Sequence, residues 1–190
     1  TLQFGANNTT DYSSRFSTAA NQSYRLDTNG QNVTLAGNLT SSGGSLTKLG
    51  AGRLTVSGTN SYSGGTVVSA GRLAYDAGGN TGLIGNINPF GTGSVTVNSG
   101  AQLRLGTNVG NHNNSVFNIA NAVTLNGGTV YEEDGIQHLT GAIDVTAAST
   151  LACAAEPHAA VSAALATVRS PRGTSAIAIP SVGCPTNDNV

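Results

Sequence analysis

Residues 46–73 read LTKLGAGRLTVSGTNSYSGGTVVSAGRL, in which short apolar positions alternate with glycine, serine, threonine and asparagine. In the triplet Leu54-Thr55-Val56, the first and third side chains point to one face of a strand and the second points to the other. The glycines between such triplets mark places where tight turns are expected. The stretch therefore predicts short β-strands joined by tight turns.

Similar triplets recur along the chain with a step of about 20 residues, which is typical of a repeat architecture. A βαβ unit needs about 30 residues, so the step is too short for one. It fits one coil of a β-solenoid, in which stacked coils bury a continuous apolar stripe. Sandwich and barrel folds also show short strands with turn signals, but their water-facing strands usually carry more charge than this chain offers. The triplets are Val33-Thr34-Leu35, Leu54-Thr55-Val56, Leu73-Ala74-Tyr75, Val95-Thr96-Val97, Val123-Thr124-Leu125 and Ile143-Asp144-Val145.

Charge is scarce in this sequence. Only 9% of the 190 residues are charged, 26 are glycine, and the formal net charge is −1. An average soluble domain has about 25% charged residues, so hydroxyl and amide groups must supply most of the solubility here. The low content of lysine and arginine argues against nucleic-acid binding. No apolar run approaches the roughly 18 residues that a membrane-spanning helix requires.

The composition changes at about residue 151, which divides the chain into a predicted solenoid (1–151) and a distinct tail (152–190). The tail is rich in proline and alanine and contains both cysteines, but it has few glycines and asparagines. Within it, Val161, Leu165 and Val168 have helical spacing, which predicts a short C-terminal helix that caps the last coil. The alternative is that the tail is a foreign or frameshifted segment that does not belong to the fold.

With these patterns in hand, residues 46–73 closely resemble the autotransporter passenger-associated strand repeat. The resemblance covers about residues 24–151 when the more degenerate flanking coils are included. It implies a right-handed parallel β-helix that is secreted and displayed on a bacterial surface, and it implies no catalytic residues. The matching positions are Leu46, Thr47, Lys48, Gly50, Gly52, Leu54, Thr55, Ser57, Gly58, Asn60, Tyr62, Gly64, Gly65, Thr66, Val68, Gly71 and Leu73.

The densest polar cluster lies in the segment YEEDGIQH and contains Glu132, Glu133, Asp134 and His138. Three carboxylates gathered on a turn suit Ca²⁺, which prefers six to eight oxygen ligands. Glu132 and His138 are instead candidates for acid–base catalysis or for a transition metal. The simplest alternative is a solvated turn whose acidic side chains face water.

Three further features are expected to lie at the margins of the solenoid. The polar segment 106–118 predicts a long surface loop, and the aromatic residues Tyr12, Phe16 and Tyr24 predict a cap over the first coil. Cys153 and Cys184 would close a loop of about 30 residues if they paired, which adds about 3 kcal/mol in the chain-entropy model. Free thiols are equally compatible with the sequence.

The sequence supports two functional hypotheses. The first is a non-catalytic scaffold or adhesin on a bacterial surface, with surface glycans or other proteins as partners and the 106–118 loop and the acidic turn as binding elements. The second is a hydrolase or lyase that acts on carbohydrates or small esters through residues 132–138, with Ca²⁺ as a candidate cofactor. The fold alone does not decide between these hypotheses.

Overall fold

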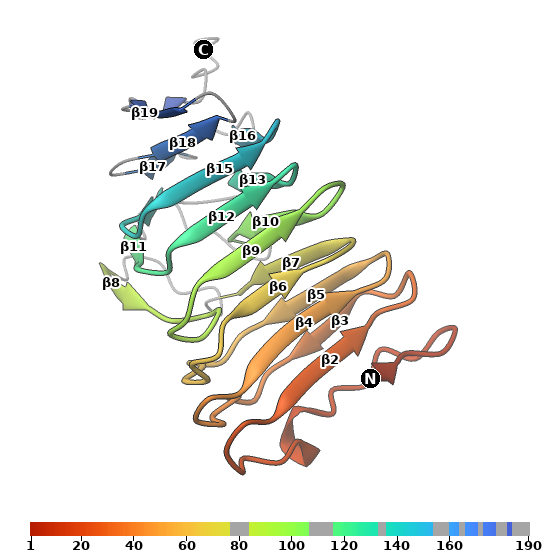
Figure 1. Cartoon of the computed structure of the whole chain (residues 1–190). Coiled ribbons are helices and arrows are strands. Elements are labelled where there is room, and N and C mark those ends of the chain that lie inside the picture. Colours follow the sequence, from red (N-terminus) through yellow and green to blue (C-terminus); the bar gives the residue numbers. More distant parts are fainter. Residues whose placement is uncertain are drawn as a thin grey trace, which may run out of the picture.

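The computed structural model shows an all-β molecule in which short strands stack into successive coils along one axis (Figure 1). Among the described residues the only helical element is the single 3-10 turn η1 (Ser13–Arg15), so the predicted β-solenoid class is confirmed. The structure describes residues 1–76, 84–106, 116–132, 136–153, 160–163, 166–170, 173–177 and 182–183.

The strands form three sheets, here called sheets A, B and C. Sheet A contains β1 (Leu2–Gln3), β2 (Ser23–Asp27), β4 (Ser45–Leu49), β6 (Thr66–Val68), β9 (Val95–Asn98), β12 (Val123–Asn126), β15 (Ile143–Ala147), β18 (Ala166–Ser170) and β19 (Gly173–Ile177). Sheet B contains β3 (Val33–Leu35), β5 (Arg53–Val56), β7 (Arg72–Tyr75), β10 (Gln102–Leu105), β13 (Thr129–Glu132) and β16 (Thr150–Cys153). Sheet C contains β8 (Ile84–Ile87), β11 (Val116–Ile119), β14 (Ile136–Leu139), β17 (Ala160–Ala163) and β20 (Val182–Gly183). From β2 to β7 the chain alternates between sheets A and B, and from β7 to β18 it passes through sheets B, C and A in turn.

The parallel register places equivalent buried side chains directly above one another, one from each coil. Each buried apolar side chain contributes about 1.5–3 kcal/mol when it leaves water, and no single coil could bury these positions alone. In sheet A the inward ladder consists of Tyr24, Leu46, Thr66, Val95, Val123 and Ile143. In sheet B it consists of Val33, Leu54, Leu73, Leu103 and Val130.

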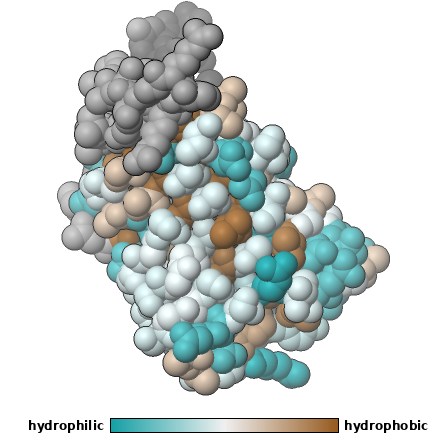
Figure 2. All heavy atoms as spheres, viewed as in Figure 1, coloured by the Kyte–Doolittle hydropathy of each residue, from teal (hydrophilic) through white to brown (hydrophobic). Residues whose placement is uncertain are grey.

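The outward side of sheet A is neither strongly polar nor strongly apolar. Figure 2 shows this face largely in the white of intermediate hydropathy, with the hydrophilic residues gathered toward the N-terminal end. The reason lies in the alternation of the strands, since Thr47, Thr96 and Thr124 occupy outward positions between buried neighbours. Short hydroxyl side chains thus cover much of the face, and Val67 lies among them as an apolar outward residue.

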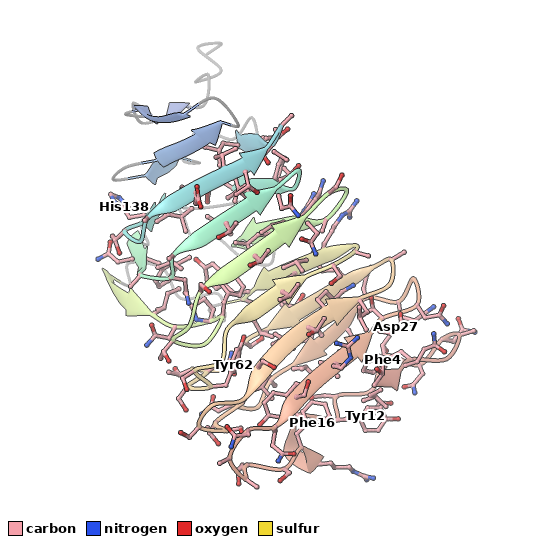
Figure 3. The ribbon with its side chains drawn as sticks, in the orientation of Figure 1. Phe4, Tyr12, Phe16, Asp27, Tyr62 and His138 are labelled. Atoms are coloured by element: carbon pink, nitrogen blue, oxygen red, sulfur yellow. The ribbon has the colours of Figure 1, made fainter. Side chains whose placement is uncertain are left out.

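Aromatic side chains close the N-terminal end of the solenoid, as the sequence predicts. The ring centroids of Phe16 and Tyr24 are 5.7 Å apart, and those of Phe4 and Tyr12 are 5.9 Å apart. Phe4, Tyr12 and Phe16 lie together at this end, beside the first coil (Figure 3). The hydroxyl of Tyr24 donates a hydrogen bond to the carbonyl of Ser17 at 2.9 Å, which ties η1 and its following loop to β2.

The predicted C-terminal helix is wrong, because part of the tail continues the sheets. β17 pairs in parallel with β14, and β18 pairs in parallel with β15. The edges of β14 and β15 offer a row of backbone partners, and this outweighs the helical spacing of the apolar residues in the tail. After β18 the pairing changes, since β19 and β20 run antiparallel to β18 and β17. The division of the chain at residue 151 stays a prediction.

Candidate functional site

Lys48 is the fourth residue of β4 and is fully buried, and its ammonium group reaches the turn that follows the strand. Its ammonium group donates hydrogen bonds to the carbonyls of Leu49 (2.8 Å) and Gly50 (2.7 Å) and to that of Ala70 in the next coil (3.2 Å). Burial lowers the pKa of Lys48 to about 8, although the nearby Asp27 carboxylate raises it. The only lysine of the chain therefore fastens two neighbouring coil turns together and is not presented to a ligand.

Close packing against the neighbouring turn explains why residue 71 is a glycine. Gly71 has a positive φ of 65°, and a Cβ added there would lie 2.5 Å from the Gly50 carbonyl and 2.9 Å from the Lys48 ammonium. An L side chain is strained in this backbone region and would also collide with the turn above. The absence of a side chain at Gly71 thus leaves the space in which the Lys48 ammonium group lies.

Asn60 and Tyr62 complete the same coil on its third side, which has no strand in this turn. The side chain of Asn60 accepts a hydrogen bond from the Leu39 N–H at 2.8 Å and donates one to the Pro89 carbonyl at 2.6 Å. It therefore joins the coils on both sides. The Tyr62 hydroxyl lies 2.6 Å from the hydroxyl of Thr66, and burial raises the pKa of Tyr62 well above its usual value.

Replacing Asn60 with alanine is expected to lower the free energy of unfolding by about 2–3 kcal/mol, because a buried N–H and a buried carbonyl lose their partner. Urea denaturation at neutral pH measures the change. Asn126→Ala is the matched control, since Asn126 is exposed and its side chain makes only long, exposed contacts, at 3.4 Å with Asn98 and at 3.5 Å with Thr146, among the described residues. Equal losses in the two variants would show that Asn60 does not link the coils.

The structure separates two of the predicted site residues. Glu132 ends β13 on its inward face and is fully buried, next to Leu105 in the register. His138 lies on the outward face of β14, on the side opposite to buried Leu139, and Figure 3 shows it at the outer margin of the molecule. The two side chains are thus not brought together, and their pairing in catalysis stays a prediction.

The other predicted site elements fall outside the described residues. These are Glu133 and Asp134 of the calcium hypothesis, residues 107–115 of the long loop, and the side chains of Cys153 and Cys184. Within the described part of the chain, no three His, Cys, Asp or Glu side chains converge on a point that could hold a metal ion. The calcium site and the disulfide stay predictions.

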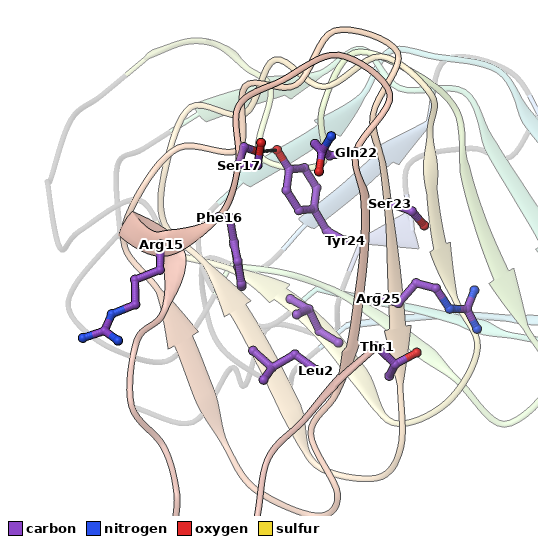
Figure 4. Close-up of a pocket in the computed structure, with 10 residues that line it drawn as sticks. Thr1, Leu2, Arg15, Phe16, Ser17, Gln22, Ser23, Tyr24 and Arg25 are labelled. Atoms are coloured by element: carbon purple, nitrogen blue, oxygen red, sulfur yellow. Dashed lines mark hydrogen bonds between the residues drawn. The ribbon is translucent and has the colours of Figure 1, made fainter.

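A hollow of about 210 Å³ lies at the N-terminal edge of sheet A, where β1 covers only the last two residues of β2. Figure 4 shows Phe16, Leu2 and Tyr24 around it, while Arg15 and Arg25 extend to opposite sides. The lining of the hollow is mixed polar and apolar, and its two guanidinium groups do not converge on a common point.

The outward face of sheet B carries a cationic strip that the alternating sequence patterns did not indicate. Arg53 and Arg72 are direct register partners, and Gln102 lies beside Arg72 on the next strand. Arg104 is two positions further along that strand, and its guanidinium carbon lies 4.7 Å from the ring centroid of Tyr131. We call these five residues the arginine strip. It is the densest set of positive charges in the described part of the chain.

A groove of about 460 Å³ runs beside the arginine strip at the corner between sheets A and B. Its floor is formed by the coil turns at residues 51–52 and 70–71 and by Gly100, and its side is formed by Arg72 and Gln102. A Cβ placed on Gly100 would meet nothing within 4 Å, which shows that the groove is open at this point.

Comparison with known proteins identifies the central coil. Residues 46–74 match the family model described as passenger-associated-transport-repeat. The stacked parallel strands agree with a β-solenoid, and the recognisable repeat is of the kind described for autotransporter passengers, as the sequence indicates. No curated protein and no solved structure gives a significant match to the chain. No helix in the described residues is long and apolar enough to cross a membrane.

Proposed function

We propose that this chain is a segment of an exported scaffold on a bacterial surface, which holds and spaces binding elements outside the cell. One observation carries the proposal. In residues 46–74, which match the passenger repeat, the buried polar side chains are used inside the coil stack. Lys48 and Asn60 donate hydrogen bonds to carbonyls of neighbouring coils, and the Tyr62 hydroxyl bonds to Thr66 inside its own coil. The repeat therefore supplies rigidity and leaves recognition to its outward faces.

The low charge of the chain also supports an extracellular scaffold role. Outward positions are occupied mostly by threonine, serine and asparagine, whose hydroxyl and amide groups interact with water over a long face without a strong field. Adhesion through such a scaffold would depend on the few outward side chains that are charged or aromatic. The arginine strip contains several of these charged and aromatic side chains.

Surface display tests the proposal. The chain is fused between a cleavable export signal and the translocating domain of an autotransporter in a Gram-negative host, with an epitope tag at its N-terminal end. We expect the tag to be reached by antibody on intact cells and the solenoid to resist added protease. Retention of the tag inside the cell, or rapid digestion of the displayed chain at the solenoid strands, would contradict the proposal.

A variant separates the role of folding from that of export. Lys48→Ala weakens the link between two coils and is expected to reduce the protease-resistant displayed fraction. Arg25→Ala is the matched control, because Arg25 is exposed on β2 and makes no ion pair with the described residues. Equal display and protease resistance of both variants would show that the coil stack is not needed at the surface.

A further inference from the structure

The arginine strip places three positive charges close together in a chain that has few positive charges elsewhere. The sequence contains eight lysine and arginine residues in 190, and three of them lie on adjacent strands of one outward sheet face. Neighbouring strands are about 4.8 Å apart, so the side chains of Arg53 and Arg72 leave the sheet side by side. Like charges directly opposite each other in a sheet are destabilising unless an anion lies between them.

No acidic group in the described part of the chain neutralises this pair. The guanidinium groups of Arg53 and Arg72 make no hydrogen bond or ion pair with the described residues, and Arg72 is exposed. The acidic residue nearest to Arg72 along β7 is Asp76, four positions on and therefore about 13 Å away in an extended strand. The pair is thus left to attract an anion from solution.

The adjacent groove limits the shape of the anion that can bind beside the arginine pair. Its floor of glycine and alanine turns allows a flat ring to approach the backbone, and its volume of about 460 Å³ lies in the range of small-molecule sites. Gln102 at its side supplies amide N–H donors, while its side-chain oxygen accepts a 3.4 Å hydrogen bond from Nε of Arg104. These features suit a hydroxyl-rich ring that carries a negative group.

We propose that the arginine strip and its groove bind an anionic glycan. The guanidinium groups of Arg53 and Arg72 hold a sugar carboxylate or sulfate through paired N–H donors, which match the geometry of such groups. The sugar ring lies in the groove, and Gln102 bonds to its hydroxyl groups. Arg104 and Tyr131 extend the strip toward the next sugar, where their stacked pair offers a planar surface.

A glycan fits better than a nucleic acid. Binding to a phosphate backbone depends on many cationic contacts along a broad surface, whereas this chain has a net charge of −1 and only three guanidinium groups on the described part of the face. The proposal adds a binding site to the scaffold role. A chain that is displayed on cells but binds no anionic glycan would refute the site and leave the scaffold role intact.

The test is calorimetric titration of the full chain with hexagalacturonate and with a heparin-derived hexasaccharide at about 50 mM salt, a concentration at which charge contacts are only partly screened. We expect one of these anionic probes to bind and neutral maltohexaose not to bind. The double variant Arg53→Ala/Arg72→Ala should lose at least tenfold in affinity. Arg15→Ala/Arg25→Ala removes the same charge elsewhere and should stay within about twofold of the wild type.

A second variant tests the groove itself. Ala51→Trp places a large side chain in the groove at an exposed turn position and should also weaken binding at least tenfold, while the urea midpoint stays close to that of the wild type. The proposal is overturned if neither anionic probe binds, or if both arginine double variants lose affinity equally. It is also overturned if oligothymidylate of equal charge binds as tightly as the better glycan.

Discussion

Replacing Lys48 with alanine is expected to lower the free energy of unfolding by about 3–5 kcal/mol. The substitution removes a packed aliphatic stem and also removes the donor to the Gly50 and Ala70 carbonyls. A buried carbonyl without a donor costs about 1–3 kcal/mol, and the lost packing adds to this cost. Urea denaturation followed by circular dichroism measures the change.

The pH dependence of stability tests whether the Lys48 amino group is buried. The folded pKa of Lys48 is about 8 and lies below the ordinary value of 10.5. Between these values the unfolded chain keeps a proton that the folded chain has released, so the stability of the wild type rises with pH in this window and is flat below it. Lys48→Met keeps most of the stem and cannot titrate, and it serves as the reference.

We expect the difference in stability between wild type and Lys48→Met to widen by about 1–3 kcal/mol from pH 8 to pH 10.5, since a tenfold difference in proton affinity between the folded and unfolded chains corresponds to about 1.4 kcal/mol. Subtracting the reference removes the titration of the tyrosines from the comparison. A difference that stays constant over this range would show that Lys48 is not buried as an ammonium group.

The second large effect is expected at Tyr62, where substitution by alanine should cost about 3–5 kcal/mol. The ring is fully buried and forms an edge-to-face pair with Tyr24, with ring centroids 6.4 Å apart. It also packs against the next coil, because a Cβ on Gly91 would lie 2.6 Å from the Tyr62 ring. The alanine variant therefore leaves a cavity that spans two coils.

Two companion variants separate the contributions at Tyr62. Tyr62→Phe keeps the ring and removes only the hydroxyl, and it should cost about 1–1.5 kcal/mol, because Thr66 still donates to the Phe90 carbonyl at 2.9 Å. Tyr131→Ala removes an outward, partly exposed ring and should cost about 1 kcal/mol or less. Similar losses in Tyr62→Ala and Tyr131→Ala would contradict the inward role of Tyr62.

The sequence predicts the solenoid architecture, but it does not predict which sheet each strand joins. Alternating triplets and glycine turns predict the solenoid, because a period of two with frequent breaks allows few other packings. The series of triplets is nevertheless not a single ladder. Leu54 and Leu73 belong to sheet B, whereas Val95 and Val123 belong to sheet A. Apolar triplets look alike wherever they lie on a coil, so spacing alone cannot assign them to a sheet.

The candidate site is harder to predict. Lys48 is recognisable as part of the repeat, but its role depends on carbonyls that only the stacked coils bring together. The arginine strip does leave a signal, since Gly-Arg-Leu occurs twice, at residues 52–54 and 71–73, in equivalent positions. The acidic residues after Glu132 favour a solvated turn for its side chain, yet β13 extends through Glu132 and turns it inward.

Residues 46–74 form one coil stacked directly on its neighbours, and disulfide trapping tests this arrangement. Thr47 and Val67 are register partners, and Thr96 lies one strand beyond Val67. Neighbouring strands are about 4.8 Å apart, within the range that a disulfide spans, whereas strands two positions apart in the sheet exceed the limit of about 7 Å.

The measurement compares Thr47→Cys/Val67→Cys with Thr47→Cys/Thr96→Cys after mild oxidation, with peptide mapping to identify the bonded residues. The stacked-coil account predicts that the first pair forms a disulfide and the second does not. A disulfide in the second pair but not in the first would contradict it.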